Sequence, residues 1–163
     1  MVELAGFHGE IRFALMSSTK DKILDDIKTA MKAKDKQRLG TLRLVSAAIK
    51  QREVDDRADL DDDGMLAVLE KMVKQRKESI AQYKEAGRDD LLATEEAELV
   101  IIREYMPEAM PAAEVESLIK KAIDEVGASS MKDMGKVMGK VKGQLQGRAD
   151  MSEVSSQIKA MLS

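Results

Sequence analysis

The stretch that decides the architecture is residues 69–107, LEKMVKQRKESIAQYKEAGRDDLLATEEAELVIIREYMP. Apolar residues recur in it at helical spacing on both sides of a Gly87-Arg88 turn. They are Leu69, Met72, Val73, Ile80 and Tyr83 before the turn, and Leu92, Leu99, Ile102 and Met106 after it. A glycine is the residue that most readily ends a helix, and Pro107 cannot continue one. The pattern predicts a long antiparallel hairpin with helices at about 62–86 and 89–105.

A charged residue interrupts each apolar stripe of this hairpin. Arg76 lies in the middle of the first stripe, Glu95 within the second, and Glu98 at its edge. Antiparallel packing predicts a partly buried ion pair between Arg76 and one of these glutamates, which would fix the register of the two helices. The alternative is an arginine kept in a cleft for a carboxylate or phosphate ligand.

Helical periodicity continues through the rest of the chain, so the fold class is all-α. A helix capped by Ser18 and a second helix from about Asp35 are predicted to precede the hairpin, giving four helices. Pro107 and Pro111 mark a break, and three short helices are predicted after it, at 112–126, 131–146 and 151–162. Ser129-Ser130 is predicted to cap the middle one.

These elements predict four segments along the chain. Residues 1–16 form an N-terminal extension, 17–106 an N-terminal helical domain, 107–111 a proline-containing linker, and 112–163 a small three-helix domain. The extension is predicted because residues 1–15 do not fit the pattern that follows, and Met16 stands just before the predicted helix cap. We therefore expect Met16 to be the native initiator.

Composition excludes several classes of function. The 163 residues include no cysteine and one histidine, with 44% hydrophobic, 35% charged and 2% aromatic residues. Thiolate metal sites, disulfides, iron–sulfur clusters and a cysteine nucleophile are excluded, and multi-histidine metal sites are disfavoured. No apolar run is long enough to cross a bilayer. We expect no cofactor, no metal and no membrane association. The lack of cysteines and of a signal peptide predicts a cytoplasmic protein.

Charge is segregated along the chain. Residues 71–88 carry six basic and two acidic side chains, whereas residues 89–116 carry one basic and nine acidic. Packing of antiparallel neighbours would let such segments neutralise one another. A basic segment left without an acidic neighbour would instead attract nucleic acid.

The segment 131–147 combines glycines and lysines in an unusual way. Gly135, Gly139 and Gly143 lie away from its apolar stripe and alternate with Lys132, Lys136 and Lys140. Each glycine inside a helix costs about 1 kcal/mol relative to alanine, so close approach of another molecule would explain their presence. A phosphate backbone and a partner helix both fit. A broken helix, or coverage by a neighbouring helix of the same chain, is the structural alternative.

Several of these motifs together resemble the GatB/YqeY family. They are Lys74–Ile80, Ala86–Leu91, Glu95 with Glu98-Leu99, Glu104–Pro107, Lys132–Gly139 and Gly147–Asp150. The resemblance covers residues 17–163 and departs at Met106, where the family usually has leucine. It implies a two-part all-α fold similar to the tail of the B subunit of the tRNA-dependent amidotransferase.

The resemblance implies a function connected with tRNA. Family members are associated with carbon–nitrogen ligase activity with glutamine as amido donor, yet this chain shows no catalytic constellation. We therefore expect a tRNA-binding or accessory module that works with amidotransferase or other protein subunits. The expected phosphate contacts are Lys132, Lys136, Lys140, Lys142 and Arg148, with Gly135, Gly139 and Gly143 permitting close approach. The alternative is a protein–protein interaction module that uses the glycine-rich face 135–147.

Overall fold

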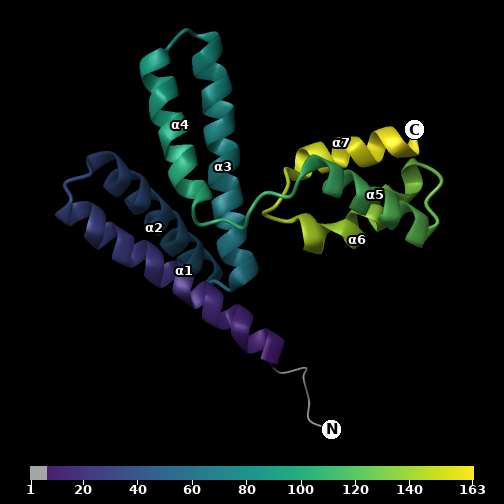
Figure 1. Cartoon of the computed structure of the whole chain (residues 1–163), viewed down its shortest axis with the longest axis horizontal. Coiled ribbons are helices and arrows are strands. Elements are labelled where there is room, and N and C mark those ends of the chain that lie inside the picture. The colour runs from purple at the N-terminus through teal and green to yellow at the C-terminus, as the bar shows by residue number, and fades with distance from the viewer. Residues whose placement is uncertain (1–6) are drawn as a thin grey trace. The chain divides into compact units, whose positions relative to one another are not determined.

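The computed structural model describes the backbone of residues 7–163 and the side chains from Thr19 onward. Every regular element in this range is helical, which confirms the all-α prediction (Figure 1). The elements are α1 (Phe7–Lys32), α2 (Lys36–Asp56), α3 (Asp62–Glu85), α4 (Asp89–Arg103), α5 (Ala112–Val126), a 3₁₀ turn η1 (Met131–Asp133), α6 (Met134–Leu145) and α7 (Met151–Leu162). They divide into two compact units, residues 1–106 and 107–163, which we call unit 1 and unit 2.

The helix starts in unit 1 follow the expected capping chemistry except at α1. Asp35 accepts a hydrogen bond from the amide of Arg38 at 3.0 Å, and Asp61 accepts one from the amide of Gly64 at 2.8 Å. These carboxylates satisfy amides that have no partner within the helix. By contrast, α1 begins at Phe7 and runs past the predicted cap at Ser18. The proposed extension lies partly in residues 1–6, outside the described part of the chain.

The core of unit 1 lies where all four helices meet. Its fully buried members include Ile23, Leu42, Val45, Leu69 and Ile102, and the one buried aromatic side chain is that of Tyr105. The long α3–α4 hairpin extends beyond α1 and α2 (Figure 1). In this projecting segment, residues 73–101, no residue is buried. We call it the hairpin arm.

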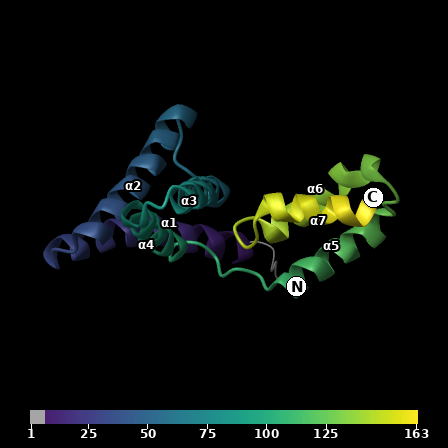
Figure 2. The same ribbon diagram turned by 90° about the horizontal axis from the view of Figure 1, so that it is seen from above.

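Unit 2 has a separate aliphatic core. Its central members are Ile119 of α5, Val137 and Leu145 of α6, and Ile158 of α7, none of which is more than 1% exposed. Figure 2 shows α6 and α7 lying side by side, in agreement with their contacts. Gly127 ends α5 with φ of 62°, a left-handed conformation that favours glycine.

The predicted helix over 131–146 differs at its start. Met131–Asp133 form a 3₁₀ turn, and α6 begins at Met134. The expected cap from Ser129-Ser130 is also wrong in its direction. Ser130 makes no side-chain capping bond, and the Asp133 carboxylate instead accepts a hydrogen bond from the Ser129 amide at 3.1 Å. The carboxylate is the acceptor because it is the charged, stronger partner for an amide at a helix start.

Candidate nucleic-acid interface

The three glycines of α6 face open space. Gly135, Gly139 and Gly143 are exposed, and a Cβ added at any of them would meet nothing within 4 Å. The helix is continuous across them, from Met134 to Leu145. The glycine face is therefore neither a break in the helix nor covered by a neighbouring helix of the described chain.

Position within α6 changes the energetic meaning of these glycines. Gly135 is the second residue of the helix and Gly143 the third from its end, so only Gly139 is in the interior. The cost of about 1 kcal/mol per glycine applies fully only in a helix interior. The total cost is therefore lower than three interior glycines would impose, and Gly139 carries most of it.

The lysines around this face are all exposed, but two are partly neutralised. Lys136 lies 3.4 Å from the carboxylate of Asp133, and Lys140 lies 3.3 Å from that of Glu125. Lys132 and Lys142 have no ion-pair partner among the described residues. The Ser129 amide, helped by Lys136, holds the pKa of Asp133 below its ordinary value, so this carboxylate keeps its charge at neutral pH.

Arg148 differs from the lysines because part of it is used within unit 2. Its Nε donates to the carbonyl oxygen of Glu108 at 3.1 Å, and its own carbonyl accepts a hydrogen bond from the amide of Met110 at 2.8 Å. The two bonds join the chain before α7 to the segment between Pro107 and Pro111. Arg148 thus organises the start of unit 2, whatever else its guanidinium binds.

The other predicted charged site lies on the hairpin arm. The Nη2 of Arg76 is 2.9 Å from Oε2 of Glu98, and its Nε is 3.8 Å from Oε2 of Glu95. The three side chains are 15%, 16% and 21% exposed, in that order. One guanidinium held by two carboxylates has no positive charge left for an anionic ligand. The geometry favours the structural interpretation over a ligand-binding arginine.

Sequence reasoning missed a polar cluster at the base of unit 1. The Tyr105 hydroxyl donates to the carboxylate of Asp26, and Arg38 makes a two-pronged contact with Glu104 at 2.8 and 3.2 Å. Arg38 also reaches the Tyr105 hydroxyl at 3.3 Å, and the Lys22 ammonium lies 5.5 Å from the centre of the ring. The cluster joins α1, α2 and the residues after α4.

Both unusual pKa values in the described chain's buried polar groups come from this cluster. Burial, and then the hydrogen bond to Asp26, raise the pKa of the Tyr105 hydroxyl far above its ordinary value of 10.0. The hydrogen bond to Glu104 raises the pKa of Arg38. Both groups therefore keep their protons at neutral pH, and neither is prepared to act as a base.

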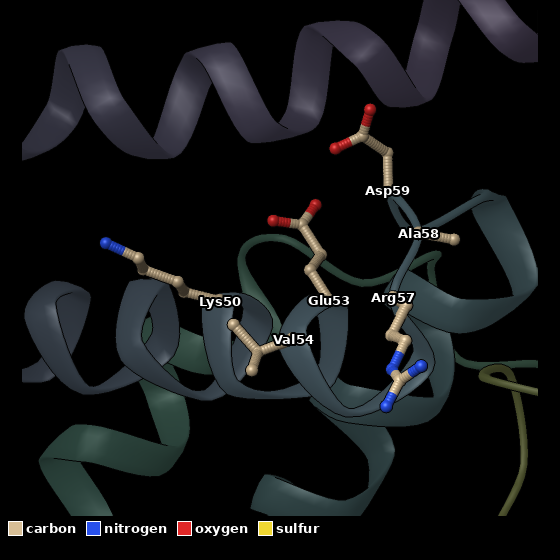
Figure 3. Close-up of a pocket in the computed structure, with 6 residues that line it drawn as sticks. All are labelled: Lys50, Glu53, Val54, Arg57, Ala58 and Asp59. Atoms are coloured by element: carbon tan, nitrogen blue, oxygen red, sulfur yellow. The ribbon is translucent and has the colours of Figure 1, made fainter.

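The largest surface depression near charged residues also lacks a catalytic arrangement. It has a volume of about 430 Å³ and is lined by Lys50, Glu53, Val54, Arg57, Ala58 and Asp59. In Figure 3 the ends of Lys50 and Arg57 point in different directions, so they do not converge on a common anion. Glu53 is held by Lys20 at 2.6 Å, which lowers the pKa of its carboxyl group.

Two further searches of the described residues were negative. No group of three or more histidine, cysteine, aspartate or glutamate side chains is arranged to hold a metal ion. No helix in this part of the chain has the length and apolar character needed to cross a membrane.

Comparison with known proteins gives a family match over nearly the whole chain. The family model described as "Yqey-like protein" matches residues 20–162. This range contains both units and every residue of the glycine face and of the hairpin arm.

Curated relatives are fungal proteins named "Altered inheritance of mitochondria protein 41, mitochondrial". The one from Lachancea thermotolerans is 31% identical over 157 residues, which is 90% of this chain and 84% of the relative. The one from Eremothecium gossypii is 41% identical over 60% of this chain and 53% of the relative. The one from Vanderwaltozyma polyspora is 32% identical over 82% and 76%.

These names contradict the cytoplasmic localisation predicted from the sequence, since the relatives are named as mitochondrial proteins. The prediction failed for a physical reason. A chain without cysteines carries no record of the redox state of its compartment. The lack of a secretory signal excludes only one route.

Proposed function

Because the chain belongs to the YqeY-like family, we propose that it is an accessory protein that binds tRNA through α6 of unit 2. The resemblance of the family to the tail of the amidotransferase B subunit is the source of the tRNA proposal. In this proposal the chain contributes to carbon–nitrogen ligase chemistry by presenting tRNA, with glutamine as amido donor, and other subunits supply the catalysis.

The observation that carries the proposal is the open glycine face with its surrounding lysines. Phosphate groups need both positive charge and close access to the protein backbone, and α6 offers the two together. The exposed lysines at 132, 136, 140 and 142 supply the charge. The glycines leave at least 4 Å of free space where a Cβ would project.

The division of labour with other subunits follows from the described side chains. Tyr105 and Arg38 hold their protons, and the carboxylates nearest to them are used in hydrogen bonds. No nucleophile with an adjacent base is present among the described residues. We therefore expect no turnover of glutamine by the purified protein alone.

Binding of tRNA should be measured at 50 and 200 mM salt, with bulk tRNA and with mitochondrial tRNA because of the names of the relatives. A variant with Lys132, Lys136 and Lys140 changed to alanine should lose most of the affinity. With four or five phosphate contacts, log Kd should change with log salt with a slope of about 3 to 4.5.

A matched control separates a specific interface from general loss of charge. Lys120, Lys121 and Lys159 are exposed, lie in the same unit and are not on α6. Their change to alanine removes the same three charges and should leave tRNA binding nearly unchanged. Equal loss in both variants, or no binding of the native protein at low salt, would overturn the proposal.

The second candidate is a protein-interaction module, favoured by the same open glycines. A partner helix could pack closely on Gly135, Gly139 and Gly143, as small residues allow in other helix pairs. This candidate predicts weak dependence of binding on salt. It also predicts that Gly139→Leu abolishes capture of the partner, whereas the triple lysine variant retains it.

A further inference from the structure

The hairpin arm is an element with a large apolar content and no buried residue. Val73, Ile80 and Tyr83 on α3, and Leu92 and Leu99 on α4, are all half-buried. They contact each other across the hairpin, and beyond the core the arm consists of these two helices alone (Figure 1). Most helices in proteins depend on packing of an apolar face against further structure. The arm therefore has an apolar face that the described chain leaves partly open.

One stripe of the arm alternates apolar and charged residues. Residues three and four positions apart share a helix face, so Ile80 is followed on its stripe by Lys84, and Leu92 by Glu96. Both Lys84 and Glu96 are exposed and have no ion-pair partner among the described residues. The charged residues therefore lie at the edges of the apolar strip, as in an interface with a polar rim.

The two helices of the arm carry opposite charge. Residues 73–88 include five basic and two acidic side chains, whereas residues 89–101 include five acidic and no basic ones. Internal pairs join Arg76 to Glu98 and Arg88 to Asp90. Beyond these pairs, α3 keeps three lysines, and α4 keeps an excess of carboxylates. The arm thus presents a basic edge beside an acidic edge.

We propose that two copies of this chain associate arm to arm, with α3 of one copy against α4 of the other. A two-fold axis parallel to the helices places each basic edge on the acidic edge of the second copy and buries both apolar strips. A two-fold axis perpendicular to the helices would instead stack α3 on α3, which brings like charges together. Charge therefore selects one of the two symmetric arrangements.

Charge also selects the occupant. A nucleic acid would gain from α3 but would be repelled by the acidic α4 on the same face. A second copy is complementary to both edges at once, and no other partner is needed to explain the pattern. The face closes against itself because a two-fold interface uses the same surface twice.

The size of the face predicts a weak association. The arm is roughly 20 Å long, from 1.5 Å rise per residue over the part of α3 beyond Met72, and about 20 Å wide. Two such faces bury an area near the lower limit for specific protein interfaces. We expect a dissociation constant on the order of 100 μM, so the dimer forms only at high concentration.

Sedimentation velocity of the full chain at 5–500 μM tests the proposal. The weight-average sedimentation coefficient should rise with concentration, and the rise should be smaller at 500 mM salt than at 50 mM. A single monomeric species throughout this range at low salt would overturn the proposal. So would association that salt strengthens, because that indicates apolar contact without charge complementarity.

Charge reversal provides the decisive comparison. Lys84→Glu alone, and Glu96→Lys alone, should each weaken self-association roughly tenfold because the symmetry repeats the repulsive contact. An equimolar mixture of the two variants should recover association, since each then meets its opposite charge. Folding is checked by the helical circular dichroism signal of each variant.

A matched control uses Lys74→Glu, the same change at an exposed position of α3 off the stripe. It should leave the dissociation constant within about twofold of the native value. If Lys74→Glu weakens association as much as Lys84→Glu, or if the mixture associates no better than its components, the proposed arrangement is wrong.

Discussion

Arg76 shows how one charged side chain can be tolerated within an apolar stripe. Its guanidinium is 15% exposed and lies between Glu98 and Glu95. Arg76→Ala should lower the free energy of unfolding by about 1–3 kcal/mol, because two partly sheltered carboxylates lose their partner. Arg76→Met combined with Glu98→Leu should cost less than Arg76→Ala, because no isolated charge remains at that position. Urea unfolding of the three proteins measures the difference, and a more costly double variant would contradict the argument.

Tyr105 provides a test that depends on pH. Tyr105→Phe removes the hydrogen bond to Asp26 and should lower the free energy of unfolding by about 1–2 kcal/mol at pH 8. The pKa of Tyr105 is raised in the folded state, so its contribution is complete below pH 10 and is lost as pH rises further. The difference between native protein and variant should therefore shrink between pH 9 and 11. A constant difference in urea unfolding over this range would contradict the assignment.

The two residue clusters differ in how far the sequence could predict them. Arg76, Glu95 and Glu98 occupy facing stripes of one hairpin, and a short turn fixes which residues meet. Arg38 and Glu104 are 66 positions apart, and Tyr105 and Asp26 are 79 apart. Their contact depends on the packing of α1 and α2 against the end of α4, which no local pattern specifies. Periodicity therefore finds pairs within a hairpin and misses pairs between distant helices.

At the scale of the element, α6 offers a contrast between two glycines. Gly139 is in the helix interior with open space beyond it, so Gly139→Ala should raise the free energy of unfolding by about 0.5–1 kcal/mol. Gly127 ends α5 with positive φ, and Gly127→Ala should lower it by about 1 kcal/mol. Thermal unfolding followed by circular dichroism compares them. Destabilisation by Gly139→Ala would show that a contact restricts this face.

Helix existence followed from the sequence more readily than helix boundaries did. The apolar spacing of α3, α4 and α5 identified them, and the turn residues Gly87 and Gly127 ended them where expected. The start of α6 was misplaced because Asp133 competes with Ser129 and Ser130 as the capping group. The start of α1 was misplaced because Ser18 can serve either as a cap or as an ordinary helical residue. Boundaries depend on such local competition, whereas apolar spacing is a property of the whole helix.

For the whole molecule, composition predicted an aliphatic all-α protein, but it gave no information about compartment. The described core residues are aliphatic or methionine except for Tyr105 and a few alanines. Charge segregation gave a partial prediction: neutralisation by neighbours occurs within the hairpin, at Arg76 and Arg88. The remaining charge on the hairpin arm needs a second molecule to be neutralised, and this is the point at which a single sequence stops specifying the outcome.

The two units should respond separately to core mutations, because each has its own set of buried residues. Ile119→Ala in unit 2 and Leu69→Ala in unit 1 each remove a fully buried side chain and should cost about 2–5 kcal/mol. Since the lost contacts belong to one core, amide exchange should accelerate in α5–α7 for Ile119→Ala and in α1–α4 for Leu69→Ala. Hydrogen exchange with mass spectrometry on the full chain resolves the two sets of peptides. Faster exchange in both units from either change would mean that the two cores unfold as one cooperative structure, and the charge-reversal variants of the hairpin arm would then need to be compared at matched global stability.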